Sequence, residues 1–418
     1  MTTPGFSPPL RIVLCCSSPL EKKKEKKGKK PAAPWGATTA GAVELALFGD
    51  LTEDGEERWE PLGVASAVPL GDDVELRSFT TPRGLPSQAG TFLDEALHTL
   101  LVIFVDGELL AKKDFLDWLA ACARDPGMAS GRHAFLPVLR GEETRDRWLG
   151  LDGYEVFRKF QARLFSSLGE DAERVDWLAL VLLKEARQLA AYGVDRKRSK
   201  LKLFVSHAKH DGLALAKSLN RLLDGVEWLE KFYDVESLSS FRPWESQLEE
   251  AVATSIVVAL RTDIYDQRPY CQKEVMWAEQ YGSPLVLVDA RGGLVHAGMG
   301  LPFEAAPCVR IPDGNLVRVL HVVLRVSLRS QAFLRRVTEL QRLGVLPEGA
   351  AIRVIPVTPG MPALLAACEA LQGRRGVICY PDPKLPKGRL EAAKAWAATV
   401  EAELVTPAER LLAAEAAP

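Results

Sequence analysis

The chain has 418 residues and a formal net charge of -2, with 47% hydrophobic and 26% charged residues. This length allows two or three domains with sizeable cores, and the balanced charge excludes a globally basic nucleic-acid-binding protein. Seven cysteines, an odd number with no CxxC pair, argue against a disulfide framework or a zinc module. No apolar run approaches the ~20 residues of a membrane span, and no secretory signal is visible. We therefore expect a cytoplasmic protein without membrane contact.

The first part of the chain, residues 1–195, has the pattern of an α/β domain. Residues 10–16 form an apolar run typical of a buried strand, residues 38–48 have helical spacing, and residues 63–68 could add a strand. The lysine-rich run at 21–30 is expected to be a solvated loop. The alternative is a docking site for nucleic acid or another phosphate-rich partner.

The order of elements in this part recurs later in the chain. In both places an amphipathic helical stretch leads into an apolar strand, a charged loop, a tryptophan-bearing helix and a proline-containing strand. The two copies comprise residues 92–97, 100–105, Trp118 and 135–139, and residues 247–252, 255–260, Trp277 and 284–288. We interpret residues 1–195 as a second, degenerate α/β unit of flavodoxin-like type that senses, regulates or assembles.

Residues 198–335 form the central domain. Strands of near-continuous Val, Ile and Leu alternate with amphipathic helices, which predicts a parallel sheet covered on both faces. Ligands of such sheets bind outside the carboxyl ends of the strands. Polar residues close the predicted strands there: Ser206, Asp234, Arg261 and Asp289. Asp211 precedes a clean amphipathic run and is a candidate helix N-cap.

Three groups of residues in this domain follow one another at domain-sized spacing. They are 204–208 (Phe-Val-Ser-His-Ala) with Asp211, then Phe232, Tyr233 and Asp234 with Leu238 and Trp244, and last Tyr265 with 270–274 (Tyr-Cys-Gln-Lys-Glu). Over roughly residues 198–330 the chain resembles the bacterial NAD-cleaving members of the Toll/interleukin-1 receptor (TIR) family. It departs from the family's pattern at Phe241, where many members have glycine in the second (BB) loop, and at Tyr270, where tryptophan is usual. By the same resemblance residues 1–195 are a degenerate TIR-like lobe, which lacks the Ser-His box and the glutamate; Asp117 is nearest to the glutamate's position.

The resemblance implies a catalytic Glu274 and a substrate site formed by Ser206, Lys209, His210, Ser240, Trp244 and Tyr270. Residues four apart share a helical face, so Tyr270 and Glu274 are expected to point into one crevice. A carboxylate beside the ribose would stabilise the oxocarbenium-like sugar that remains when neutral nicotinamide departs. The Tyr270 ring would stack on a flat heterocycle, and Lys209 would suit the pyrophosphate. NAD+ is then a substrate, and no metal or other cofactor is implied. The structural alternatives are that Ser206 braces the strand-to-helix turn and that Cys271 is a packed residue.

Two further elements follow the central domain. Residues 315–337 are predicted to form an amphipathic helix, with a basic stripe that is expected to be solvated: Arg318, His321, Arg325 and Arg329. Residues 345–418 have a βαβαβ pattern, which is half of a doubly wound sheet. Its strands are predicted at 351–357, 376–380 and 402–405 and its helices at 364–371 and 390–398. This segment forms a third lobe or completes a sheet.

The first functional hypothesis is an NAD+ nucleosidase of bacterial antiviral type, which releases nicotinamide and ADP-ribose or a cyclic variant. Because TIR members typically act as assemblies, we expect self-association through the BB loop. We also expect activation by a partner protein or a nucleotide, and not by nucleic acid. The second hypothesis is a non-catalytic TIR scaffold that recruits partners, which Phe241 in the BB loop favours. The third is a binding module in which the N- or C-terminal lobe senses a nucleotide and the TIR domain transmits the signal.

Overall fold

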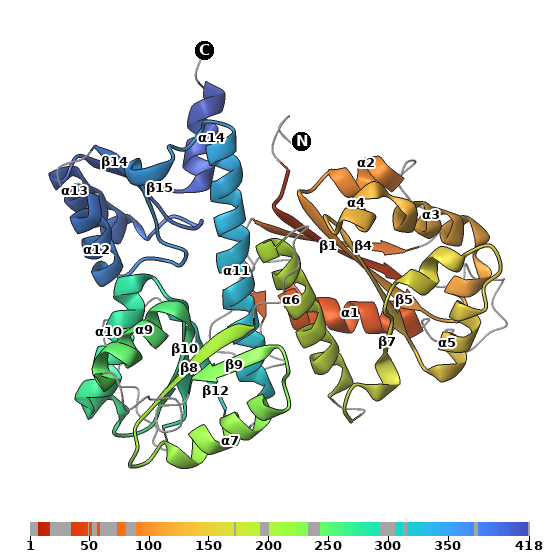
Figure 1. Cartoon of the computed structure of the whole chain (residues 1–418), viewed down its shortest axis with the longest axis horizontal. Coiled ribbons are helices and arrows are strands. Elements are labelled where there is room, and N and C mark those ends of the chain that lie inside the picture. Colours follow the sequence, from red (N-terminus) through yellow and green to blue (C-terminus); the bar gives the residue numbers. More distant parts are fainter. Residues whose placement is uncertain are drawn as a thin grey trace. The chain divides into compact units, whose positions relative to one another are not determined.

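The fold was analysed in a computed structural model (Figure 1). It describes residues 7–16, 35–48, 50–51, 57–58, 73–80, 89–170, 173–192, 200–232, 243–291, 306–311, 314, 316–371 and 375–416. These residues divide into two compact units, one up to residue 192 and one from residue 200 onward. Three sheets of five, five and three strands are parallel throughout. The predicted α/β class of flavodoxin-like type is confirmed.

The N-terminal unit is built on a sheet in the order β4-β1-β5-β6-β7. Its strands are β1 (Leu10–Cys16), β4 (Val74–Thr80), β5 (His98–Val105), β6 (Ala134–Leu139) and β7 (Arg163–Leu164). Counted along the chain within this sheet, the order is 2-1-3-4-5, which is the flavodoxin-like order. Every residue of β1 and β5 is buried, as expected for strands that are covered on both faces. A short antiparallel pair, β2 (Asp50–Leu51) and β3 (Glu57–Arg58), lies outside this sheet.

Helices cover both faces of this sheet. One face packs into a cluster with α2 (Ala89–Asp94) and α3 (Lys113–Arg124). The other is contacted by α1 (Trp35–Phe48) and α6 (Arg174–Tyr192). The remaining helical segments are α4 (Pro126–Ser130), α5 (Glu142–Leu149), η2 (Leu109–Ala111), η3 (Glu155–Lys159) and η4 (Phe165–Ser167).

The second unit begins with a sheet of the same design, in the order β12-β11-β10-β8-β9. Its strands are β8 (Leu201–His207), β9 (Leu229–Phe232), β10 (Ile256–Arg261), β11 (Leu285–Asp289) and β12 (Cys308–Arg310). Counted along the chain, this is again 2-1-3-4-5. The repeat seen in the sequence therefore corresponds to a repeat in topology.

Helices also cover this second sheet. α9 (Trp244–Thr254) and α10 (Pro269–Tyr281) pack on one face, and the single turn η5 (Tyr265–Gln267) precedes α10. α7 (Leu213–Asp224) and α11 (Val317–Arg342) cover the other (Figure 1). Ser206, Arg261 and Asp289 lie at the carboxyl ends of β8, β10 and β11.

The chain ends in a three-stranded parallel sheet, β13-β14-β15. The βαβαβ pattern predicted here is present as β13 (Ile352–Val354), α12 (Met361–Leu371), β14 (Gly376–Cys379), α13 (Lys387–Thr399) and β15 (Ala402–Val405). It is preceded by η7 (Gly349–Ala351) and followed by α14 (Pro407–Ala416). The helices α12 and α13 form one core with the sheet, and the C-terminal part of α11 forms another with its opposite face.

The prediction that the basic stripe on α11 is solvated is wrong. His321 and Arg325 are 2% and 1% exposed, and Arg329 donates a 2.7 Å hydrogen bond to the carbonyl oxygen of Asp382. The helical period shows which side chains share a face, but it does not show how many neighbours the helix has. α11 contacts β10, β11 and β12. It also contributes Phe333 and Val337 to the core on one face of the C-terminal sheet, so little of its surface is exposed to water.

Several sequence predictions lie outside the described residues: the strand at 63–68, the lysine-rich run at 21–30, and Asp234, Ser240 and Phe241 of the second loop. Within the part of the chain that is described, no helix has both the length and the apolar character needed to cross a membrane.

Gly282→Ala is expected to lower the stability of the protein, because it disturbs the packing of the end of α10 against the C-terminal lobe. Gly282 ends α10 with φ +65, and an added Cβ would lie 3.3 Å from Pro356 Cδ and 3.4 Å from Ile355 Cγ2. A left-handed alanine costs about 1–2 kcal/mol, and crowding adds to that cost. The control is Gly344→Ala, which has φ +72 but meets nothing within 4 Å. Chemical unfolding of the full chain should show the larger loss for Gly282→Ala; equal losses would contradict a packing role at Gly282.

Candidate functional site

Three polar side chains meet in the interior at the carboxyl end of the second unit's first sheet. Ser206 is the next-to-last residue of β8, Tyr265 begins η5, and Glu274 lies in the second turn of α10. The Ser206 hydroxyl is 2.5 Å from Glu274 Oε2 and 2.6 Å from the Tyr265 hydroxyl. The three residues are 1%, 0% and 8% exposed. Two short hydrogen bonds thus join Ser206 to residues that lie 59 and 68 positions later in the sequence.

Local sequence explains how each of these side chains is placed. β8 pairs with β10 so that Ser206 lies opposite Ala259, a small residue that leaves room above the strand. α10 begins with Pro269 after the extended Arg268 and ends at the left-handed Gly282, which are favoured start and stop residues. Its buried face therefore carries Glu274 among apolar neighbours: Cys271, Val275, Trp277 and Ala278. A carboxylate is rarely buried unless it has a partner, and Ser206 is one such partner of Glu274.

The directions of the two hydrogen bonds follow from the number of protons available. Ser206 has one hydroxyl proton and donates it to the Glu274 carboxylate. Its oxygen must then accept from Tyr265, so the tyrosine is the donor of the 2.6 Å contact. Burial first, and then the charge of Glu274, raise the pKa of Tyr265 well above its ordinary value. Tyr265 therefore keeps its proton at any physiological pH.

Cys271 lies one turn before Glu274 and is not poised as a nucleophile. Burial, with a smaller contribution from the Glu274 charge, raises the pKa of its thiol to about 12. A neutral thiol is a weak nucleophile. This agrees with the interpretation of Cys271 as a packed residue.

Two aromatic side chains from the predicted substrate set pair on the surface. Trp244 begins α9, Tyr270 is the second residue of α10, and their rings meet edge to face at 5.0 Å. They are 43% and 53% exposed. Lys273, which forms an ion pair with Glu245 of α9, braces the two helices next to the aromatic pair. Tyr270 lies one helical turn before Glu274, and helical spacing predicts that the two side chains point into one crevice. The Tyr270 ring lies at the surface, whereas the Glu274 carboxylate lies in the interior.

The loop after β8 exposes Lys209 and His210 and holds Asp211. The prediction of Asp211 as a helix N-cap is wrong, because Gly212 occupies that position and no side chain caps α7. Asp211 instead accepts hydrogen bonds from the Thr262 hydroxyl (2.8 Å) and the Ile264 amide (3.2 Å). Its carboxylate therefore ties the loop after β8 to the loop after β10, which leads to Tyr265. Ser240, the remaining member of the predicted set, is outside the described residues.

Two other charged strand ends are occupied by ion pairs. Arg261 is 2% exposed and holds Asp266 through its Nε, 2.8 and 2.9 Å from the two carboxylate oxygens. Asp289 accepts from Arg291 at 2.7 and 3.0 Å, which lowers the pKa of the Asp289 carboxyl. These ion pairs hold the charged side chains at the carboxyl ends of β10 and β11 in place. Glu274, by comparison, accepts a hydrogen bond from the hydroxyl group of Ser206.

The N-terminal unit has an apolar counterpart at each position of this cluster. Cys15 is the next-to-last residue of β1, Leu109 begins η2, and Trp118 is the sixth residue of α3, as Glu274 is of α10. All three belong to one hydrophobic cluster. Trp118, and not the neighbouring Asp117, therefore stands where the second unit has Glu274.

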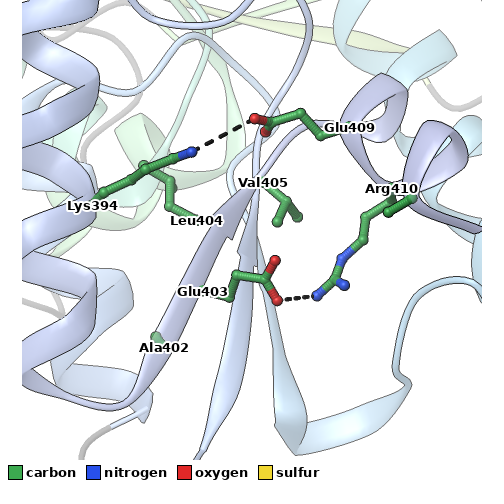
Figure 2. A pocket seen from close by; sticks show the side chains of 8 residues that line it. Lys394, Ala402, Glu403, Leu404, Val405, Glu409 and Arg410 are labelled. Atoms are coloured by element: carbon green, nitrogen blue, oxygen red, sulfur yellow. Dashed lines mark hydrogen bonds and ion pairs between the residues drawn. The ribbon is translucent and has the colours of Figure 1, made fainter. Parts of the chain in front are cut away.

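Two cavities lie away from this cluster. One, of about 290 Å³, is lined by β15, α13 and α14 (Figure 2). The charges that line it are paired, Lys394 with Glu409 at 3.7 Å and Arg410 with Glu403 at 2.5 Å. The other, of about 360 Å³, lies beside β9 and α9. Neither is lined by a residue of the predicted site, and the described residues contain no group of three His, Cys, Asp or Glu suited to a metal ion.

The hydrogen bond that links the two loops should respond to pH in a defined direction. Burial would raise the pKa of Asp211, but the bonds from Thr262 and Ile264 outweigh it and lower the pKa below its ordinary value of 3.8. The contact is therefore present at neutral pH and is lost only as the pH falls through that lowered value. In Asp211→Ala, hydrogen exchange at the Ile264 amide should accelerate at pH 6. The Ala216 amide, which donates to Gly212, should be unchanged; faster exchange at Ala216 instead would restore the capping role.

Comparisons with known proteins assign no family to the chain. No model of a known protein family matches it, and no curated protein matches it. What the site does must therefore follow from its own residues and contacts.

Proposed function

We propose that the chain is an NAD+ nucleosidase of TIR type that acts in bacterial antiviral signalling. It cleaves the bond between nicotinamide and ribose to give nicotinamide and ADP-ribose or a cyclic variant. The observation that carries this proposal is the buried Glu274 carboxylate, bonded to Ser206 at 2.5 Å at the carboxyl end of a parallel sheet. Such a position is where ligands of this sheet type bind.

The chemistry requires one carboxylate and no added cofactor. The bond between C1′ and the nicotinamide nitrogen breaks, its electron pair goes to the nitrogen, and nicotinamide leaves without charge. The ribose then carries the positive charge as an oxocarbenium ion, which a carboxylate held beside it stabilises. Water adds to C1′ and releases a proton to give ADP-ribose, whereas attack by an internal nucleophile gives the cyclic product. Because the leaving group is already neutral, the acid that glycosidases supply with a second carboxyl is not needed.

The residues around Glu274 suit the rest of the dinucleotide. The exposed rings of Trp244 and Tyr270 offer a stacking surface for nicotinamide or adenine. Lys209 and His210 lie exposed in the loop after β8 and would face the pyrophosphate. Ser206 orients Glu274 and closes the site beneath the ribose. Ser240 would join this set from the BB loop.

The proposal includes control by assembly. Neighbouring protomers would contribute BB loops, so the resting protomer has low activity and self-association raises it. The N-terminal unit, with apolar residues in place of the polar cluster, would regulate this step in response to a partner protein or a nucleotide. We also propose a cytoplasmic location, which suits seven cysteines that are all free and buried.

A non-catalytic scaffold is the second candidate, and one observation favours it. Four large side chains are at least 43% exposed on α9 and α10: Trp244, Tyr270, Met276 and Tyr281. Two of them, Trp244 and Tyr270, are in contact, and exposed apolar side chains that lie together often mark protein interaction sites. In that case Glu274 would be a structural residue, and NAD+ would remain intact.

Glu274→Gln is expected to reduce nicotinamide release by about 10²–10³-fold, because an uncharged amide cannot stabilise the sugar cation. The matched control is Glu279→Gln, which makes the same change on the same helix, away from Ser206. Concentrated full-length protein is incubated with NAD+, and nicotinamide is quantified by chromatography. Equal activity of the wild type and Glu274→Gln would favour the scaffold.

Tyr270→Ala is expected to raise KM for NAD+ about tenfold with a smaller change in kcat, since stacking one base contributes about 1–3 kcal/mol. Tyr270→Phe and Tyr270→Trp keep a flat ring and should retain a KM within about twofold of the wild type. Steady-state kinetics of the three variants test the point. An unchanged KM in Tyr270→Ala would remove this ring from the substrate site.

A further inference from the structure

The hydroxyl of Tyr265 is completely buried, and its bond to Ser206 is made far from solvent. The ring packs among Val257, Ala259, Cys271 and their neighbours in the core between β10 and α10. Tyr265 cannot reach a substrate from this position, yet two hydrogen bonds through Ser206 connect it to the Glu274 carboxylate. We propose that Tyr265 is a positioning residue, which acts through Ser206 to aim Glu274 at the ribose. This rests on the proposed NAD+ cleavage.

The chain of hydrogen bonds runs in one direction. Tyr265 donates to Ser206, and Ser206 donates to Glu274 Oε2. A serine hydroxyl rotates freely when it has only one partner, and it can then send its proton elsewhere. With Tyr265 donating to its oxygen, the Ser206 proton points at Glu274. Aligned donors also polarise one another, so the second bond is strengthened by the first.

The N-terminal unit indicates that this arrangement is not needed to build the fold. A sheet with the same strand order is stable there with Cys15, Leu109 and Trp118 at the three positions. Burying polar groups is unfavourable unless every one of them is hydrogen-bonded. The second unit nevertheless places a hydroxyl, a phenol and a carboxylate at these positions. The three polar residues differ together from the apolar set, as expected if they work as one unit.

The function of such a chain is orientation. A glutamate side chain has several rotamers of similar energy, and only some bring its oxygens toward a ribose at the mouth of the sheet. Fixing one oxygen from below limits the carboxylate to a single orientation before the substrate arrives. An effect of this kind changes the rate of bond cleavage more than the affinity for NAD+, because it acts in the transition state.

The test is a double-mutant cycle on the full-length protein, with kcat and KM for nicotinamide release from NAD+ as readouts. The variants are Tyr265→Phe, Ser206→Cys and the double variant. Ser206→Cys introduces the residue type that the N-terminal unit has at this position, Cys15. A cysteine is similar in size to serine, but its thiol is only a weak hydrogen-bond donor. Ser206→Thr keeps the hydroxyl and serves as the rescue. The matched control is Tyr380→Phe, another fully buried tyrosine, whose hydroxyl accepts from the Leu385 amide in the C-terminal lobe.

Tyr265→Phe is expected to lower kcat about 3- to 10-fold with KM within about twofold, and Ser206→Cys to lower it about 10- to 100-fold. The double variant should match Ser206→Cys alone, because the proposed effect of Tyr265 on Glu274 passes through the Ser206 hydroxyl. Ser206→Thr, which keeps the hydroxyl, should lose less kcat than Ser206→Cys, and Tyr380→Phe should retain the wild-type kcat within about threefold. Circular dichroism confirms that each variant is folded; should Ser206→Cys not fold, Tyr265→Phe compared with Tyr380→Phe decides.

Two results overturn the positioning role alone. In the first, the wild type is active and depends on Glu274, but Tyr265→Phe leaves kcat unchanged. In the second, Tyr265→Phe lowers kcat as much in the Ser206→Cys background as in the wild type. A wild type that releases no nicotinamide, or releases it independently of Glu274, overturns the proposed function and the positioning role together. The two failures are therefore distinguishable in one experiment.

Discussion

The hydrogen bond between Ser206 and Glu274 requires that a strand end and a helix face stay in register across the core. A buried carboxylate that lost this bond would be strongly unfavourable, so β8, η5 and α10 must hold their relative positions. Several contacts serve that purpose: Asp211 ties the two loops, the Lys273–Glu245 pair joins α9 and α10, and Gly282 seats the end of α10 against the C-terminal sheet. The surrounding structure is thus arranged to keep one side chain in place.

The two large sheets show how a common architecture can carry or omit chemistry. Both have the order 2-1-3-4-5, and both place a strand end, a single turn and a helix around one small interior region. In the N-terminal unit that region is closed by Cys15 and Trp118, and burial raises the pKa of the Cys15 thiol well above its ordinary value. A packed thiol and an indole provide cohesion but no charge that could act on a substrate.

The fold class, the apolar strands of both five-stranded sheets and the C-terminal βαβαβ segment could be predicted from the sequence, because runs of Val, Ile and Leu mark parallel strands. The strands β4, β7 and β12 were not predicted, because each is either very short or rich in polar residues. Glu274 was singled out by the family resemblance, and helical spacing added only that it shares a face with Tyr270. The contact of Tyr265 with Ser206 could not be predicted, since no periodicity shows that one ring is fully buried with its hydroxyl against Ser206. Asp211 was misplaced because an aspartate before a helix looks the same whether it caps that helix or holds a neighbouring loop. The α11 stripe failed because the sequence does not show how many partners a helix has.

α11 is a single rod of 26 residues, roughly 39 Å long at 1.5 Å per residue. One stretch of it completes the cover of the second five-stranded sheet, and another stretch completes the core of the three-stranded sheet. Unwinding of α11 from either end would remove apolar cover from one sheet and loosen the helix that covers the other. We therefore expect the two sheets of this unit to unfold together in a single cooperative transition, because one helix packs against both.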